Sequence, residues 1–190
     1  MNHKLYHLIS SYSCKNEQEK RDQEFMLKII KDFPDVTTRN NKIAHFTAST
    51  WILNQAHTKV LMVYHHIYDS WSWCGGHLDG CDDPLKKTLD EGKEETGLKE
   101  ISVLLQEPLA IDLLPVHGHY KKHEYVSSHL HLNITYLCEA DENALLHNKA
   151  DENSAAAWFM MEELKHIVSE KTMLPVYEKL NKVAMSIVRK

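Results

Sequence analysis

A chain of 190 residues has the length of one domain with a small appendage, and its 43% hydrophobic and 26% charged residues are typical of a soluble globular protein. The net charge of −5 argues against a nucleic acid as the main ligand, because neutralising its backbone needs clustered lysine and arginine. No run of about 18 apolar residues could span a membrane, and the first ten residues lack the apolar core of a signal peptide. We therefore expect a cytoplasmic protein whose four cysteines are free thiols.

The apolar spacing predicts helices near both ends of the chain, with strands between them. Residues 15–33 place apolar side chains on one helical face, and Pro34 ends that run. Two strand-like segments, 43–54 and 59–66, follow, and a glycine-rich turn at 73–77 comes after them. This order already suggests that helices flank a sheet.

A short acidic helix should follow the glycine-rich turn. Asp83 reads as its N-cap, Pro84 as its first residue, and Gly97 as its stop after Thr96. Further strands are expected at 100–106, 109–115, 130–138 and 156–160, a polar loop at 116–131, and helices at 161–169 and 173–189. The pattern predicts an α/β layered domain over residues 43–190, preceded by a helical extension over residues 1–42.

The acidic helix carries Glu91, Glu94 and Glu95 at positions i, i+3 and i+4, which places three carboxylates on one face. Such neighbours repel by roughly 1 kcal/mol in water and about 3 kcal/mol at an effective dielectric of 20. A cluster of oxygen ligands suits a hard cation such as magnesium. An isolated cluster of this kind is more often a solvated helix face, so the surrounding sequence decides its interpretation.

That surrounding sequence, GHLDGCDDPLKKTLDEGKEETGL from Gly76 to Leu98, resembles the Nudix box. The positions that match in register are Gly76, Glu91, Glu94, Glu95, Gly97 and Leu98. The resemblance implies a Nudix-type α/β/α sandwich with a mixed β-sheet, and extra helices at the N- and C-termini. It also implies an enzyme, a hydrolase that cleaves diphosphate bonds in a nucleoside diphosphate linked to another moiety.

Three positions depart from the family pattern. Asp82 stands in place of the box glutamate, Asp90 in place of the box arginine, and Gly92 in place of an aliphatic residue. The charge reversal at Asp90 removes a side chain that supports the catalytic glutamate in the family. Lys86 and Lys87 are candidates to supply part of the missing charge, although a lysine lacks the arginine fork.

The resemblance implies a set of site residues and a cofactor. Mg²⁺, or alternatively Mn²⁺, would be held by the Gly76 carbonyl and by Glu91, Glu94 and Glu95. Glu91 is the favoured general base, and Glu152 in a later acidic loop is its rival. The implied partner is a small nucleotide-type substrate, with neither nucleic acid nor membrane, and a homodimer is left open.

Two other functions stay open at this point. One is a weakened Nudix domain that binds a nucleotide as a sensor or scaffold, which Asp90 would favour. The other, less favoured, is an enzyme similar to isopentenyl diphosphate isomerase, whose cysteine and glutamate motifs have no clear equivalent here.

The histidines and cysteines offer further candidates. His131 shares the polar face of its strand with His129 and is a candidate for substrate binding. Cys74, His77 and Cys81 could be three zinc ligands, but their spacing matches no common zinc motif.

Overall fold

The computed structural model describes residues 2–121, 124–149 and 153–189. The chain forms two compact units, and each of the two longest strands runs from one unit into the other. The first unit comprises Met1–Ala48, Gly76–Lys87 and Ala110–Ile134, and the second comprises Ser49–Gly75, Thr88–Leu109 and Thr135–Lys190.

Along the described residues, two α-helices are followed by four strands, one α-helix, six strands and two α-helices. The α-helices are α1 (His3–Ser11), α2 (Glu17–Asp32), α3 (Pro84–Thr96), α4 (Leu164–Ile167) and α5 (Leu174–Val188). The strands are β1 (Ala44–Asn54), β2 (Lys59–His65), β3 (Ser70–Ser72), β4 (Cys74–His77), β5 (Ser102–Val103), β6 (Ala110–Val116), β7 (His119–Lys121), β8 (Glu124–Val126), β9 (His129–Ala140) and β10 (Asn153–Met160). Short 3₁₀ helices at Met161–Glu163 and Lys171–Met173 precede α4 and α5. Among the described residues, no helix has the length and apolar character needed to cross a membrane.

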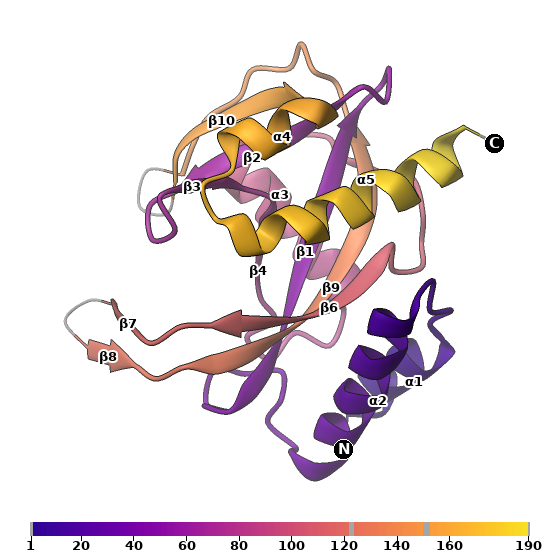
Figure 1. Ribbon diagram of the computed structural model, residues 1–190, viewed down its shortest axis with the longest axis vertical. Coiled ribbons are helices and arrows are strands. Elements are labelled where there is room, and N and C mark those ends of the chain that lie inside the picture. Colours follow the sequence, from indigo (N-terminus) through magenta and orange to yellow (C-terminus); the bar gives the residue numbers. More distant parts are fainter. Residues whose placement is uncertain (1, 122–123, 150–152, 190) are drawn as a thin grey trace. The chain divides into compact units, whose positions relative to one another are not determined.

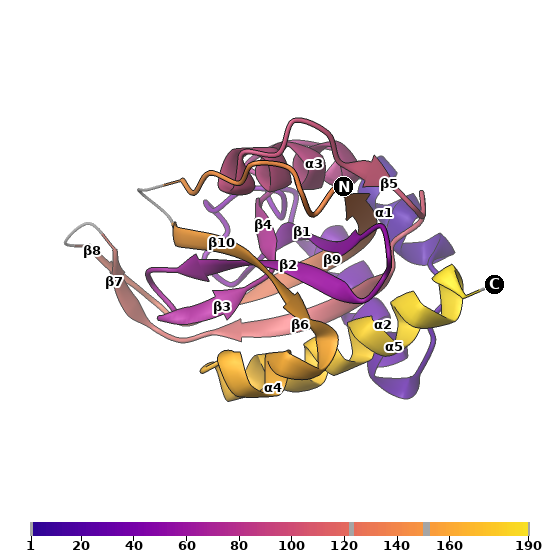
Figure 2. The same ribbon diagram turned by 90° about the horizontal axis from the view of Figure 1, so that it is seen from above.

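The second unit is built on a sheet with the strand order β10-β2-β1-β9-β5, and β3 pairs with β2. The antiparallel register sets Leu53 of β1 opposite Val60 of β2, and Ser102 of β5 opposite Glu139 of β9. Helix α3 lies on one face of this sheet, and α4 and α5 lie on the other (Figure 2). The expected α/β/α sandwich is confirmed.

Strand β1 supplies both layers of the core, because successive side chains of a strand point to opposite faces. Trp51 is fully buried and stacks on Tyr177 of α5 with ring centroids 5.3 Å apart. Ile52, the next residue, belongs to the cluster on the α3 side. The buried members of that cluster are Ile52, Leu61, Val63, Cys74, Leu98, Cys138 and Ala140. The alternation along β1 therefore holds α3 and α5 on opposite faces.

Gly92 marks the point where α3 comes closest to the sheet. A Cβ added to it would lie 2.9 Å from Cδ1 of Ile101, 3.4 Å from Cγ2 of Thr50 and 3.6 Å from Cδ1 of Ile52. The space that an aliphatic side chain would need is already occupied. This close packing explains why glycine stands at a box position where the family has an aliphatic residue.

The two ends of α3 were predicted correctly. Oδ1 of Asp83 accepts a hydrogen bond from the backbone N–H of Lys86 at 3.0 Å, which is the expected N-cap bond. Pro84 is the first helical residue and Thr96 the last. Gly97 has φ of +73°, the left-handed conformation that ends a helix and that glycine adopts without strain.

The first unit contains α1, α2 and β6, and the two helices pack against each other (Figure 1). Helix α2 is joined to β6 through Oδ2 of Asp22, which accepts a hydrogen bond from the Leu113 N–H at 3.0 Å. Helix α1 was not predicted from the sequence, although Asn2 caps it by accepting the Leu5 N–H. The boundary expected at residue 42 stays a prediction.

The predictions for two segments are wrong. Residues 74–77 were expected in a turn but form β4, which pairs with β1. The stretch 116–131 was expected to be a polar loop, but it contains β7 and β8, an antiparallel pair. Both segments are short and polar, so their strand conformation depends on pairing rather than on local preference.

The Gly92 packing gives a stability prediction. Gly92→Val should lower the free energy of unfolding by about 1–3 kcal/mol, because its methyl groups have no room beside Ile101. The melting temperature should fall by about 2–4 °C per kcal/mol. Gly92→Ala is the matched control, since one methyl group needs only the flexible end of Ile101 to move. Adding Ile101→Val to Gly92→Val should restore part of the loss, and a Gly92→Val variant as stable as the wild type would contradict the account.

Candidate active site

The acidic face of α3 does not consist of three equivalent carboxylates. Glu91 and Glu95 are 9% and 3% exposed, whereas the side chain of Glu94 is 57% exposed. Helix geometry explains this difference in exposure. Residues i and i+4, here Glu91 and Glu95, lie on nearly the same side of the helix, whereas residue i+3, here Glu94, points to a different side. Two of the three carboxylates are therefore held inside the second unit, and one faces solvent.

Glu95 is fixed at both its side chain and its backbone. Its Oε2 accepts a hydrogen bond from the backbone N–H of Gly75, in β4, at 3.0 Å. Its carbonyl oxygen accepts a second one from Nδ2 of Asn153, at the start of β10, at 3.1 Å. Asn153 is itself fully buried. The first bond orients the carboxylate and the second fixes the backbone that carries it, and a metal ligand or a catalytic group needs such a fixed position.

The surroundings of Glu95 are negative in charge. Burial raises the pKa of the Cys74 thiol well above its usual range, and the neighbouring carboxylates of Glu95 and Glu91 raise it further. Cys74 is fully buried and precedes Gly75 in β4. The thiol therefore stays protonated at neutral pH, and a protonated thiol is a poor nucleophile.

Glu94 has a basic partner. Its Oε2 lies 3.3 Å from Nζ of Lys149, whose side chain is 29% exposed. An exposed pair of this kind is weak and exchanges easily with solvent or with other ligands. Lys149 is thus positioned to neutralise the charge of Glu94 when no other ligand binds Glu94.

The remaining expected ligands are less defined. Gly76 continues β4 directly after the Gly75 that binds Glu95. Glu152, the rival general base, lies outside the described residues. The assignment of Gly76, Glu91, Glu94 and Glu95 to a metal, and of Glu91 or Glu152 to catalysis, stays a prediction.

The departure at Asp82 lies in the first unit and is on the surface. Oδ2 of Asp82 is 2.6 Å from Nζ of Lys4, and the two side chains are 54% and 74% exposed. The hydrogen bond and the charge of Lys4 lower the pKa of Asp82 below its ordinary value of 3.8. Asp82 therefore binds the N-terminal helix α1. The sequence could not predict this contact, because Lys4 is 78 residues away.

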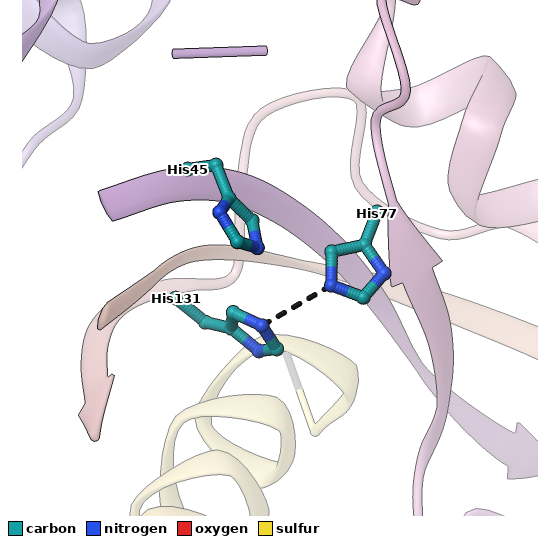
Figure 3. A group of neighbouring side chains, drawn as sticks. All are labelled: His45, His77 and His131. Carbon is teal, nitrogen blue, oxygen red and sulfur yellow. Dashed lines mark hydrogen bonds between the residues drawn. The ribbon is translucent and has the colours of Figure 1, made fainter. Parts of the chain in front are cut away.

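His131 belongs to a group of histidines within the first unit (Figure 3). Its Nε2 lies 3.2 Å from Nε2 of His77 and 3.2 Å from Nε2 of His129. The His45 ring lies 5.0 Å from the His131 ring, centroid to centroid. The substrate-binding role expected for His131 stays a prediction.

The zinc trio considered from the sequence does not form a group. Sγ of Cys81 donates to the Asp83 carbonyl oxygen at 3.4 Å, and His77 contacts His131 instead. In the described part of the chain, His45, His77 and His131 bring one ring nitrogen each within 4.8 Å of one another, and neither cysteine belongs to this group. All four cysteines are free thiols, as expected.

The Lys4–Asp82 pair gives a prediction about pH dependence. Because the folded state lowers the pKa of Asp82, the pair adds stability above pH 3.8, and this contribution is lost as the pH falls through the lowered value. Asp82→Asn should lower the melting temperature at pH 7 by less than about 2 °C, since an exposed pair contributes little. The difference from the wild type should vanish in acid. A difference that persists or grows in acid would show that Asp82 acts in some other way.

Comparison with known proteins places this chain in a family. The family model described as NUDIX domain matches residues 44–180. A Caenorhabditis elegans Ap4A hydrolase complex is similar in structure, with a TM-score of 0.54 and 16% identity over 74% of this chain and 98% of that one. So are RenU, a Nudix hydrolase from M. smegmatis (TM-score 0.56, 15% identity, 75% and 87%), and the E. coli dihydroneopterin triphosphate pyrophosphohydrolase (0.52, 12%, 76% and 96%). No curated protein sequence matches the chain. The chain belongs to the NUDIX domain family and is a Nudix hydrolase.

Proposed function

We propose that this protein hydrolyses a diphosphate bond in a nucleoside diphosphate linked to another moiety, and that it requires Mg²⁺. The observation that carries the proposal is the carboxylate of Glu95, which is 3% exposed and accepts a hydrogen bond from the Gly75 N–H. A carboxylate that is fixed in this way is suited to bind a cation, because its position is set before the ligand arrives.

The residues present fit a magnesium ion. Glu91, Glu94 and Glu95 offer only oxygen atoms, which a hard dication prefers over nitrogen or sulfur. The nearby Cys74 thiol stays protonated and does not compete. The single Lys149 contact with Glu94 is exposed and can be displaced. Mn²⁺ has similar ligand preferences and is the proposed alternative.

Each residue has a separate task in this proposal. Glu95 is the fixed ligand, since one hydrogen bond orients its carboxylate and another holds its backbone carbonyl. Glu94 is the adjustable ligand, which leaves Lys149 on binding. A magnesium ion held here supplies the positive charge that stabilises the diphosphate and lowers the pKa of an attacking water. Glu91, buried one turn before Glu95, is the proposed general base, and Glu152 is the alternative.

Similar proteins support the substrate class. The C. elegans protein is named an Ap4A hydrolase, and the E. coli protein a dihydroneopterin triphosphate pyrophosphohydrolase. Both names refer to polyphosphate linkages, although the low identities fix only the fold. The net charge of −5 supports a small-molecule partner over a nucleic acid or a membrane. The free thiols support a cytoplasmic location, and a homodimer is left open.

The function is tested by a phosphate-release screen. Dinucleoside polyphosphates, nucleotide sugars and nucleoside triphosphates are each incubated with the protein and with Mg²⁺ or Mn²⁺. The proposal expects release from at least one nucleoside diphosphate derivative and none in the presence of a chelator. Release that is unaffected by chelation, or nucleotide binding without any cleavage, would overturn it.

The metal assignment gives a prediction about Glu95. Glu95→Gln keeps the hydrogen bond acceptor for Gly75 but removes the charge, so Mg²⁺ affinity should fall by at least tenfold, about 1.4 kcal/mol. Glu94→Gln should lose less, because the exposed Glu94 carboxylate is less well fixed. The exposed Glu100→Gln, just beyond α3, is the matched control. Calorimetric titration measures all three, and equal affinity in Glu95→Gln and the wild type would remove Glu95 from the site.

The charge reversal at Asp90 gives a second prediction. Asp90 stands where the family has an arginine that supports the catalytic glutamate, so the wild type should be slow and should have a high metal requirement. Asp90→Arg restores the family residue and should raise kcat/KM by about tenfold or more, roughly 1.4 kcal/mol. Rates are compared on the substrate that the screen identifies, at saturating Mg²⁺. If the wild type is fast and Asp90→Arg is slower, Asp90 is an adapted part of this site. If neither cleaves but both bind nucleotide, the domain is a sensor or scaffold.

A further inference from the structure

Four histidines from separate stretches of the chain meet in the first unit. His45 lies on β1, His77 on β4, and His129 and His131 on β9. One ring nitrogen from each of His45, His77 and His131 can be chosen so that all lie within 4.8 Å of one another. The three rings turn toward a common centre (Figure 3). The α3 glutamates are not part of this group.

Backbone contacts orient two of the rings. Nδ1 of His45 lies 2.9 Å from the Asn41 carbonyl oxygen, and Nδ1 of His129 lies 2.8 Å from the Ser127 carbonyl oxygen. A carbonyl only accepts, so each Nδ1 carries the proton and each Nε2 of a neutral ring offers a lone pair. Nε2 of His45 is buried and has no hydrogen-bond partner among the described residues. A carbonyl that holds one nitrogen of a histidine is the usual support of a metal ligand.

The rings do not have enough N–H groups to make a hydrogen bond at each of their nitrogen–nitrogen contacts. Nε2 of His131 lies 3.2 Å from Nε2 of both His77 and His129, and one N–H can satisfy only one of these contacts. A distance of 3.2 Å is close to the separation of two nitrogens on a tetrahedral zinc ion, about 3.3 Å for Zn–N bonds of about 2.05 Å. The spacing therefore suits a cation shared by the rings.

A metal ion binds the neutral form of a histidine ring, which offers a lone pair on Nε2 when Nδ1 carries the proton. Neutral imidazole nitrogens that face one another favour borderline metals such as Zn²⁺ over Mg²⁺.

We propose that His45, His77 and His131 form a second metal site that binds Zn²⁺ in the first unit. Three histidine ligands leave the fourth tetrahedral position for a water or an anionic oxygen, the arrangement of an open zinc site. His129 is a positioning residue, since its Nε2 lies 3.2 Å from Nε2 of His131 and its ring stacks on the His45 ring with centroids 4.8 Å apart. The site differs from the proposed magnesium site in ligand type and does not depend on it.

The test measures zinc binding while the carboxylates are saturated. The full chain is stripped with a chelator, given millimolar Mg²⁺, and titrated with Zn²⁺ by calorimetry, with bound metal counted by elemental analysis. We expect one equivalent of zinc for the wild type. His45→Ala and His131→Ala should each lower the affinity by at least about 100-fold, more than the loss of a supporting residue costs. His129→Ala should keep one equivalent at reduced affinity.

Matched variants separate the possible sites. His166→Ala removes an exposed histidine from α4 and should bind zinc as the wild type does. Glu95→Gln should also keep it, so failure of the magnesium proposal would leave this result intact. Because His45 is buried, each variant is melted first, and His131→Gln replaces any variant that does not fold. No zinc binding by the wild type, an equal loss in His166→Ala, or a loss in Glu95→Gln but not in the histidine variants would overturn the proposal.

Discussion

The contact of Gly92 with Thr50 and Ile52 of β1 sets where helix α3 lies on the sheet. Because glycine has no side chain, the helix backbone comes close enough for its glutamates to reach the neighbouring strand. Glu91 lies one residue before Gly92 and Glu95 three residues after it, so helical rotation sets their positions relative to Gly92. The burial of two carboxylates is therefore a consequence of one close approach and of helix geometry.

This approach brings charged groups of the helix next to β4. Glu95 accepts a hydrogen bond from the Gly75 N–H, Glu94 forms an ion pair with Lys149, and the carboxylates of Glu95 and Glu91 add to the raised pKa of the Cys74 thiol. These carboxylates would attract a dication bound beside them. The close packing of α3 thus positions carboxylates that suit the chemistry of the Nudix family.

Local signals predicted the acidic helix well. Asp83, Pro84 and Gly97 set its ends through caps and backbone conformation, which depend on neighbouring residues alone. Contacts between distant residues could not be predicted in this way. The hydrogen bond from the Gly75 N–H to Glu95 spans 20 residues. It is made by a residue of β4, a segment that the sequence predicted to be a turn.

The histidine group shows the same limit more strongly. His77 and His131 are 54 residues apart, and their contact depends on the pairing of strands whose side chains give no sequence signal of metal binding. The alternation of its strand makes His131 a candidate, but no sequence pattern indicates a role for His45. Alternating polarity predicts which face a residue occupies, while the fold decides which other strands meet that face.

The central claim is that the fixed carboxylates of α3 bind a divalent ion. A crystal of the full chain grown with Mn²⁺ and a non-hydrolysable nucleoside diphosphate analogue tests it directly, through the anomalous scattering of manganese. The account predicts an anomalous peak within about 2.5 Å of a carboxylate oxygen of Glu95, with Glu91 or Glu94 as a second ligand. A bound analogue with no manganese at these glutamates, or manganese held elsewhere, would contradict it.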